Sequence, residues 1–302
     1  MGTTEQSSAN RPALGVFWMV LTGLLFVTVT AVVKHGAQDL PAAQSAFLRY
    51  AIGLLFLIPL IRPIREAKLS RVQVFQFGWR GLAHTFGVIL WFYAMTRITV
   101  AEVTAMNYMA PIYISIGAAL FLGEKLAARR ILAIVCGFIG ALIILRPGFR
   151  ELSDGHVAMI GTAVFFAVSY LMAKRFSSTV SASVIVGMLS VFCTIGLAPF
   201  ALFVWQTPTY AEVGWMAVVA LLATAGHYTM TLAFAAAPVT ITQPATFLQL
   251  IWATLLGYWV FGEGVDIWVL FGGALILASV TFITIREALQ KRQISAHSQL
   301  DG

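Results

Sequence analysis

The chain has 302 residues, of which 60% are apolar and only 10% are charged, with a net charge of +7. Soluble domains carry about 25% charged residues, so this composition excludes a soluble enzyme, a secreted disulfide scaffold and a nucleic-acid binder. Residues 213–262 contain no Asp, Glu, Lys or Arg, and this run is long enough for two bilayer crossings of about 20 residues each. The composition therefore predicts an all-α membrane protein.

Apolar runs bounded by charged residues, Pro or Gly predict ten membrane-spanning helices. In chain order they cover residues 14–33, 42–61, 78–97, 102–122, 129–146, 156–174, 181–205, 213–235, 239–261 and 267–286. Residues 1–13 and 287–302 remain as cytoplasmic tails. Cys136 and Cys193 lie within apolar runs and are interpreted as core residues, not as a disulfide or a metal site.

The orientation follows from the distribution of basic residues, because cytoplasmic loops carry an excess of Lys and Arg. With the N-terminus inside, 13 basic residues lie in inner loops and tails and 4 in outer loops. The inner set is Arg11, Arg62, Arg65, Lys68, Arg71, Lys125, Arg129, Arg130, Lys174, Arg175, Arg286, Lys291 and Arg292, and the outer set is Lys34, Arg97, Arg146 and Arg150. This asymmetry predicts that both termini are cytoplasmic.

Residues 14–146 and 155–286 form two repeats whose members are offset by 139 or 140 positions. The matched pairs include Gly15 with Gly155, Phe26 with Phe166, Lys34 with Lys174, Gly87 with Gly226 and Glu124 with Glu263. Each repeat holds five predicted spans, an odd number, so the second repeat is inverted relative to the first. Inverted repeats are typical of secondary transporters, which bind their substrate near the membrane midplane between the halves.

Each repeat carries a Gly-Glu pair near the end of its fourth span, in Phe121-Leu122-Gly123-Glu124 and in Val260-Phe261-Gly262-Glu263. With these features the chain resembles the EamA-type repeats of the drug/metabolite transporter superfamily over residues 14–286, and it is most similar to bacterial aromatic amino acid exporters. The resemblance implies a bacterial inner-membrane protein that exports amino acids, aromatic and other neutral ones, or related metabolites by alternating access. It implies a small-molecule substrate and no cofactor, and it leaves monomer and homodimer open.

The fourth span carries Pro111 in its middle, whereas the equivalent position in the ninth span is Leu250 and the nearest proline is Pro244. Proline removes a backbone hydrogen bond and bends a helix. We therefore expect Pro111 and Pro244 to act as bending points of a gate, at different depths in the two halves.

Two histidines lie inside predicted spans, His84 in the third and His227 in the eighth. His227 matches Val88, which lies one helical turn from His84, so both histidines project from corresponding faces. They either line a shared cavity or bond backbone carbonyls between packed helices. The cavity interpretation is favoured, because the resemblance places these helices around the cavity.

The other candidate cavity residues are polar or aromatic side chains deep in the predicted spans: Trp18, Trp91, Asn107, Tyr108, Gln243, Phe247 and Gln249. Amide and phenol groups beside a proline-bent backbone offer hydrogen bonds to a zwitterion, and aromatic rings bind planar groups or an ammonium. The same side chains also join helices or face lipid in many membrane proteins, so both interpretations stay open.

Arg49 lies about two turns into the second span, where it would either attract a carboxylate substrate, or extend to the lipid headgroups or make a structural pairing, and the latter pair of interpretations is favoured. Glu124 and Glu263 stand at helix ends, where they fix a turn or pair with loop cations. The scarcity of interior charge predicts a neutral or zwitterionic substrate.

The chain has no Walker A motif, so ATP does not drive the process. Because the first and sixth spans lack an interior acid, facilitated diffusion is favoured, and proton coupling would require His84 or His227. The alternative within transport is a multidrug or nucleotide-sugar carrier on the same fold, with or without proton coupling. An intramembrane enzyme is disfavoured, because the spans hold neither an acidic cluster for metal chemistry nor a nucleophile beside a base, so no catalytic or metal-binding residue is expected.

Overall fold

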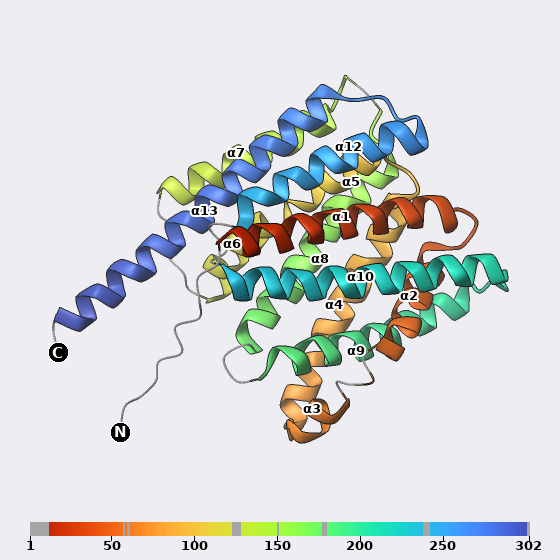
Figure 1. The fold of residues 1–302 in the computed structure, drawn as a ribbon, viewed down its shortest axis with the longest axis horizontal. Coiled ribbons are helices and arrows are strands. Elements are labelled where there is room, and N and C mark those ends of the chain that lie inside the picture. Colours follow the sequence, from red (N-terminus) through yellow and green to blue (C-terminus); the bar gives the residue numbers. More distant parts are fainter. Residues whose placement is uncertain are drawn as a thin grey trace.

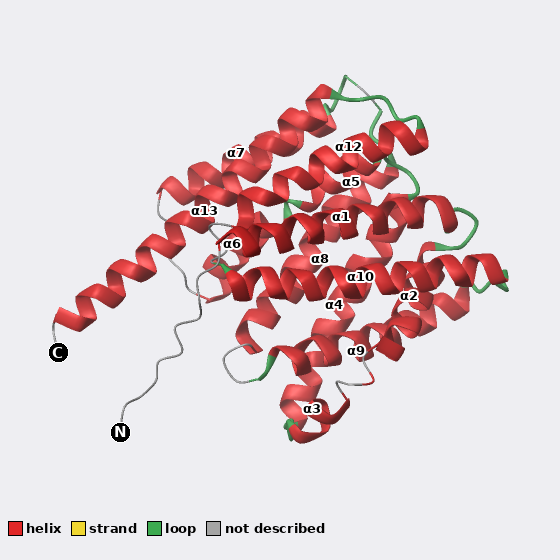
Figure 2. Cartoon of the chain, in the orientation of Figure 1, coloured by secondary structure: helices red, strands yellow, loops and turns green. Residues whose placement is uncertain are grey.

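The computed structural model describes residues 12–56, 58, 61–122, 128–149, 151–176, 180–237 and 242–300. Throughout these ranges the chain is built from helices joined by short loops, and it contains no strand (Figure 2). The prediction of an all-α protein is therefore confirmed for the described part of the chain.

The helices divide between the two predicted halves (Figure 1). The first half comprises α1 (Pro12–Gly36), α2 (Ala42–Phe56), α3 (Ile61–Glu66), α4 (Arg71–Met95), α5 (Val100–Asn107), α6 (Ala110–Leu122) and α7 (Ala128–Leu145). The second half comprises α8 (Asp154–Phe176), α9 (Ala182–Phe203), α10 (Tyr210–Ala236), the 3-10 helix η2 (Gln243–Thr246), α12 (Phe247–Phe261) and α13 (Ile267–Leu300). Helix α1 begins and α13 ends toward the same side of the molecule, at the left of Figure 1.

Five helical segments are long and apolar enough to cross a membrane: Pro12–Gly36, Asp154–Ala173, Val184–Phe203, Tyr210–Met230 and Ile267–Arg286. Shorter apolar helices cover Ala42–Phe56, Ile131–Leu145 and Leu248–Phe261. Each of these segments coincides with a predicted span. The protein is thus a multi-pass membrane protein, while the full set of ten crossings stays a prediction.

Helices α4 and α10 start with equivalent capping boxes. The hydroxyl of Ser70 accepts a hydrogen bond from the backbone N–H of Gln73, and the side chain of Gln73 accepts one from the backbone N–H of Ser70. Thr209 and Glu212, which lie 139 residues further on, form the same pair of bonds. These bonds satisfy backbone donors that a helix start leaves without a partner. The cap at Ser70 also explains why α4 begins seven residues before the predicted span 78–97.

The predicted fourth and ninth spans are both interrupted in the middle. Helix α5 ends at Asn107 and α6 begins at Ala110, so Pro111 lies in a first turn, where its missing N–H removes no helical bond. Pro244 lies in η2, which gives way to α12 at Phe247. Although the two prolines are not equivalent, the interruptions fall at nearly equivalent positions of the repeat. The bending of the two spans at Pro111 and Pro244, at different depths, stays a prediction.

The main helix pairings join one half of the chain to the other, and equivalent helices take part in equivalent pairings. Helix α1 runs along α10, and α4 runs along α8. Since the repeat relates α1 to α8 and α4 to α10, these two pairings are equivalent. In the pairings of α2 with α9 and of α7 with α13, each helix packs on its own equivalent. This reciprocity is what two similar halves joined face to face would produce.

Two glycines at equivalent positions of the repeat allow α4 to lie close to α8 and α10 to lie close to α1. A Cβ atom at Gly87 of α4 would lie 2.6 Å from the ring of Phe166 in α8. At the matching position, a Cβ on Gly226 of α10 would lie 3.2 Å from the ring of Phe26 in α1. Small residues commonly permit such helix contacts in membranes.

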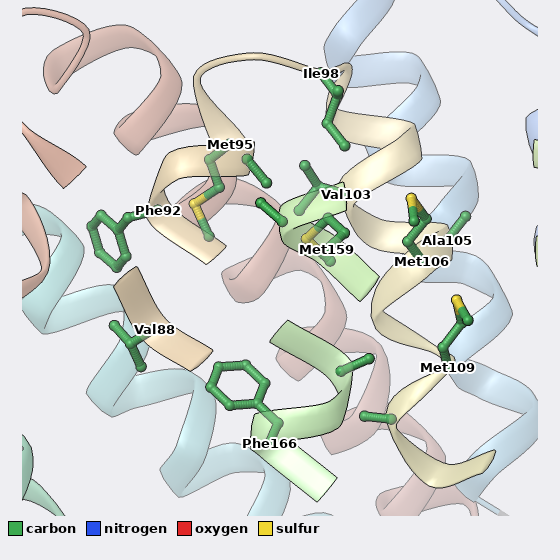
Figure 3. Close-up of a cluster of buried hydrophobic side chains, with 14 of the residues drawn as sticks. Val88, Phe92, Met95, Ile98, Val103, Ala105, Met106, Met109, Met159 and Phe166 are labelled. Atoms are coloured by element: carbon green, nitrogen blue, oxygen red, sulfur yellow. The ribbon is translucent and has the colours of Figure 1, made fainter. Parts of the chain in front are cut away.

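Buried apolar side chains from α4, α5 and α8 meet in one core. Figure 3 shows Val88 and Met95 of α4 and Val103 of α5 near Met159 and Phe166 of α8. All five are at most 6% exposed. This core holds α8 against α4 and so fixes the surroundings of His84, which lies one turn before Val88.

Candidate functional site

His84 lies near the middle of α4 and is 6% exposed. Its ring stacks on Phe166 with a centroid distance of 4.7 Å and an interplanar angle of 23°. Its Nδ1 lies 3.1 Å from the hydroxyl of Ser169, also in α8. The rings of Tyr50 and Tyr170 meet it edge-on, with centroids 6.5 Å and 6.2 Å away. His84 is thus held on α8 within a ring of aromatic side chains.

His227 lies in α10 and presents an exposed side chain although it is far from both helix ends. Its ring contacts Phe26 of α1 edge-on, with centroids 5.1 Å apart. Helix α10 packs against α2, which in turn packs against α4, so the helices that carry His84 and His227 share α2 as a neighbour. The two histidines differ in exposure, since His84 is packed and His227 is accessible.

Trp91 and Tyr170 extend the aromatic surroundings of His84. Trp91 is half-buried, its ring centroid lies 6.2 Å from that of Phe166, and its indole N–H is buried without a hydrogen-bond partner in the described part of the chain. Tyr170 is 40% exposed and lies 6.0 Å from Phe166. Together these rings offer an aromatic wall that is open on at least one side.

Arg49 is half-buried and stacks on Tyr50, which agrees with the structural pairing in the favoured interpretation. Its guanidinium carbon lies 3.9 Å from the ring centroid of Tyr50, a residue that is 6% exposed. Helix α2, which carries both residues, packs against α4, α9 and α10.

Arg80 was not singled out from the sequence, although it lies one turn before His84 and is only 3% exposed. Its Nε donates to the carbonyl oxygen of Ser169 at 3.2 Å, and its Nη1 donates to that of Ile185 at 2.9 Å. Arg80 therefore ties α4 to both α8 and α9. Arg80 could have been identified from the sequence as a basic residue in an apolar run, one turn from an interior histidine.

These side chains form what we call the central cluster, which comprises Arg49, Tyr50, Arg80, His84, Phe166, Tyr170 and His227. Its fixed charges are both positive, and α2, α4 and α9 contain no Asp or Glu. Helices α8 and α10 carry acids only in their first turns, at Asp154 and Glu212. The cluster thus combines aromatic rings, two histidines and an uncompensated positive charge.

The remaining predicted residues lie around the interrupted spans. The phenol of Tyr108 donates to the carbonyl oxygen of Thr246 at 2.7 Å, which joins the break between α5 and α6 to the end of η2. Gln249 packs against Gly23 of α1, and Asn107 ends α5 half-buried.

Trp18 is half-buried on α1 beside Met19, Ala233 and Ala245. The side chains of Gln243, Pro244 and Phe247 lie outside the described residues. Trp18 belongs to α1, Gln249 to α12, and Tyr108 directly follows α5. The central cluster is built on α2, α4, α8 and α10, so the structure divides the predicted residues into two groups.

An ion pair joins the far ends of α1 and α12. Lys34 Nζ lies 2.5 Å from Glu263 Oε1 and donates to the carbonyl oxygen of Ile98 at 2.8 Å. The other carboxylate oxygen of Glu263 accepts the N–H of Val100 at 3.0 Å. The prediction that this glutamate pairs with a loop cation is confirmed. Its repeat equivalent, Glu124, lies outside the described residues.

A cavity of about 430 Å³ lies between the end of α1, the start of α2 and the end of α4. Its lining includes Ala37, Ser45, Phe92, Tyr93 and Arg97. The hydroxyl of Ser45 is buried and has no hydrogen-bond partner in the described part of the structure. Ser45 precedes Arg49 by one turn of α2, so the cavity, whose lining also includes Asp39, ends one turn from the central cluster.

Comparisons with known proteins give a consistent result. A model of the EamA-like transporter family matches residues 13–146 and, separately, residues 154–285. Riboflavin transporters of Vibrio cholerae and Rhizobium johnstonii are each 30% identical to this chain, over 95% and 94% of it and over 98% and 95% of their own lengths.

Other relatives are named for different cargoes. The S-adenosylmethionine uptake transporter of Rickettsia bellii is 24% identical over 91% of this chain and 94% of its own. The pseudopaline exporter of Pseudomonas aeruginosa is 28% identical over 88% of this chain and 94% of its own. One solved crystal structure aligns with a TM-score of 0.59 at 18% identity, over 91% of this chain and 97% of that chain, and so shares the fold.

Proposed function

The chain belongs to the EamA-like transporter family, and we propose that it carries a small metabolite with a planar ring across a bacterial inner membrane. Its relatives are transporters of small molecules, not enzymes. The observation that supports the choice of cargo is the group of aromatic rings around His84, in which Tyr170 is 40% exposed and Trp91 is half-buried. Planar aromatic rings bind well between such side chains.

Riboflavin is the first candidate cargo. Its fused rings suit an aromatic wall, and the two riboflavin transporters match this chain over nearly its whole length. Aromatic amino acids are the second candidate, supported by Arg49 beside the rings, because a guanidinium binds carboxylates. Facilitated diffusion gives net movement down the concentration gradient, so a metabolite made in the cell would be exported.

Alternating access is the proposed mechanism, with ten spans arranged as two inverted repeats over residues 14–146 and 155–286. The exchanged pairings of α1 with α10 and α4 with α8 support this arrangement, as do the equivalent capping boxes. In the proposed cycle the Lys34–Glu263 pair holds one end closed, and the segments beside Pro111 and Pro244 bend as that end opens.

We place both termini in the cytoplasm. The excess of Lys and Arg in the inner loops supports this orientation. A fluorescent protein fused after Gly302 should fluoresce, because it folds in the cytoplasm. A dark fusion, together with activity of a periplasmic reporter at the same position, would reverse the orientation.

Uptake into proteoliposomes tests the cargo. Purified protein is reconstituted and offered radiolabelled riboflavin, tryptophan, phenylalanine, leucine and S-adenosylmethionine, with and without a pH gradient. We expect uptake of riboflavin or of the aromatic amino acids above that of protein-free vesicles, and no requirement for the gradient. Uptake of none of the ring-bearing compounds would overturn the proposed function.

A further inference from the structure

We infer that the cargo carries an anionic oxygen group, a carboxylate or a phosphate, and that Arg49 binds this group. The inference rests on the proposed function and narrows its substrate class from any planar metabolite to one with a carboxylate or phosphate, so it favours the aromatic amino acids over riboflavin itself. It agrees with the zwitterionic part of the expectation of a neutral or zwitterionic substrate and sets aside the neutral part.

The charge balance of the central cluster carries the first step. Arg49 stacks on Tyr50, whose ring meets that of His84, and Arg80 lies one turn before His84 on α4. A guanidinium keeps its proton under all ordinary conditions. The nearest acids on the flanking helices are Asp154 and Glu212, each more than ten residues from the cluster along its helix, or roughly 15 Å or more. An interior charge without a counter-charge is costly, so the site favours a ligand that supplies one.

The second step separates the roles of the two arginines. Arg80 is 3% exposed and its N–H groups bond the carbonyls of Ser169 and Ile185, so it joins helices. Arg49 instead lies over the face of Tyr50 and keeps part of its surface accessible. No acidic partner accompanies Arg49 among the described residues. Stacking on a ring leaves the edge of the guanidinium, with its fork of donors, directed away from the ring.

The repeat shows that the fold itself does not require these cations. The positions equivalent to Arg49 are Met188 or Leu189, and the position equivalent to Arg80 is Val219. Both halves nevertheless adopt the same reciprocal helix pairings. Because an apolar residue serves the second half at the position of Arg49, and Arg80 already bonds two carbonyls, the charge of Arg49 is the one that points to a ligand.

The third step concerns access. The cavity of about 430 Å³ reaches Ser45, whose unpartnered hydroxyl lies one turn from Arg49 on the same face of α2. Around Arg49 stand the rings of Tyr50 and, beyond His84, those of Phe166 and Tyr170. The arrangement fits a molecule whose planar part contacts the rings while its anionic end meets the guanidinium.

Matched ligand pairs test the inference. Binding to purified protein is measured by scintillation proximity for riboflavin against riboflavin 5′-phosphate, and for tryptophan against tryptamine, which lacks the carboxylate. We expect the anionic member of each pair to bind about tenfold more tightly or better, as one charge-assisted bidentate contact would provide. Arg49→Gln should remove this preference, and Arg49→Lys should retain part of it.

Arg62→Gln serves as the control. The guanidinium of Arg62 pairs with Glu66 at 2.8 Å on α3, where both side chains are more than half exposed and lie outside the cavity and the central cluster. This substitution should leave the preference for anionic ligands unchanged. The midpoint of thermal unfolding in detergent checks that each variant is folded.

Equal affinity of the wild-type protein for both members of each pair would overturn the inference and leave the proposed function standing. If Arg49→Gln lowers the affinity for both members of a pair equally, the inference is also overturned, because Arg49 would then act on the shape of the cavity and not on the anionic group. Binding of none of the four ligands would overturn the proposed function together with the inference.

Discussion

His84 and His227 occupy related positions but differ in their contacts. His84 is stacked on Phe166 and bonded to Ser169, so part of its role is to join α4 to α8. His227 presents an accessible ring beside Phe26. We therefore assign the larger share of cargo contact to His227.

Replacing His227 by Phe is expected to lower the initial uptake rate in proteoliposomes about tenfold, which corresponds to about 1.4 kcal/mol. The substitution keeps an aromatic ring next to Phe26 but removes both ring nitrogens from the interior. The midpoint of thermal unfolding should change little, because the ring contact is retained.

His35→Phe is the control for this prediction. His35 also meets an aromatic ring edge-on, that of Trp215 at 5.3 Å, but it lies at the end of α1. Its replacement should leave uptake within about twofold of the wild type, since surface changes away from special sites are mild. Equal losses in both variants would argue against a specific role for His227.

At the scale of helices, the crossing of α7 and α13 depends on two glycines. A Cβ at Gly140 would lie 2.7 Å from the carbonyl oxygen of Gly272, and one at Gly272 would lie 2.5 Å from that of Gly140. Backbone atoms cannot rotate away as a flexible side chain can. The two helices must therefore separate if either glycine gains a side chain.

Gly140→Val is accordingly expected to destabilise the protein by about 1–3 kcal/mol, the usual cost of forcing extra atoms into a packed contact. Thermal unfolding in detergent measures the effect as a lower midpoint. Gly53→Ala in α2 is the control, because a Cβ at Gly53 meets nothing within 4 Å. Its midpoint should stay the same or rise slightly. A Gly140→Val midpoint equal to that of the wild type would show that the crossing is not tight.

The ion pair of Lys34 and Glu263 connects the end of α1 to the region that follows α12. Both side chains are at most 16% exposed, so the pair is shielded from solvent. Glu263→Gln should weaken this closure and raise the reactivity of a cysteine placed at Ser45 about fivefold or more. The readout is labelling by a membrane-impermeant maleimide in a background with Cys136 and Cys193 replaced.

Arg62→Gln provides the comparison for the ion pair. Arg62 pairs with Glu66 at 2.8 Å on α3, where both side chains are more than half exposed. Exposed pairs contribute little, so labelling at position 45 should stay unchanged. If Glu263→Gln has no larger effect than Arg62→Gln, the Lys34 pair does not hold this end closed.

For the molecule as a whole, the sequence was sufficient to predict the long apolar helices, because a membrane helix must satisfy its backbone bonds within one long apolar segment. It did not predict the short helix α3 or the breaks within the fourth and ninth spans. The predicted spans 129–146 and 267–286 match α7 and the start of α13 to within a residue or so. The internal repeat could also be recognised from the sequence, and glycines at equivalent positions, such as Gly87 and Gly226, lie in equivalent helix contacts.

The parts that could not be predicted depend on which helices pack together. The surroundings of Arg49 depend on the position of α2 beside α4 and α10, and one sequence does not specify that pairing. The carbonyls that hold Arg80 come from α8 and α9, about 90 and 105 residues away along the chain. Polar residues in a span have a known cost, but their partners emerge only from the packed structure.

Solute counterflow in proteoliposomes tests the central claim most directly, because only a carrier that alternates between two sides exchanges internal for external cargo. Vesicles containing the purified protein are loaded with unlabelled riboflavin or tryptophan and diluted into a trace of the same compound in radiolabelled form. We predict that at least one of these compounds accumulates transiently above its equilibrium level, with no ATP or ion gradient present. Simple equilibration of both labels at the rate of protein-free vesicles would contradict the account.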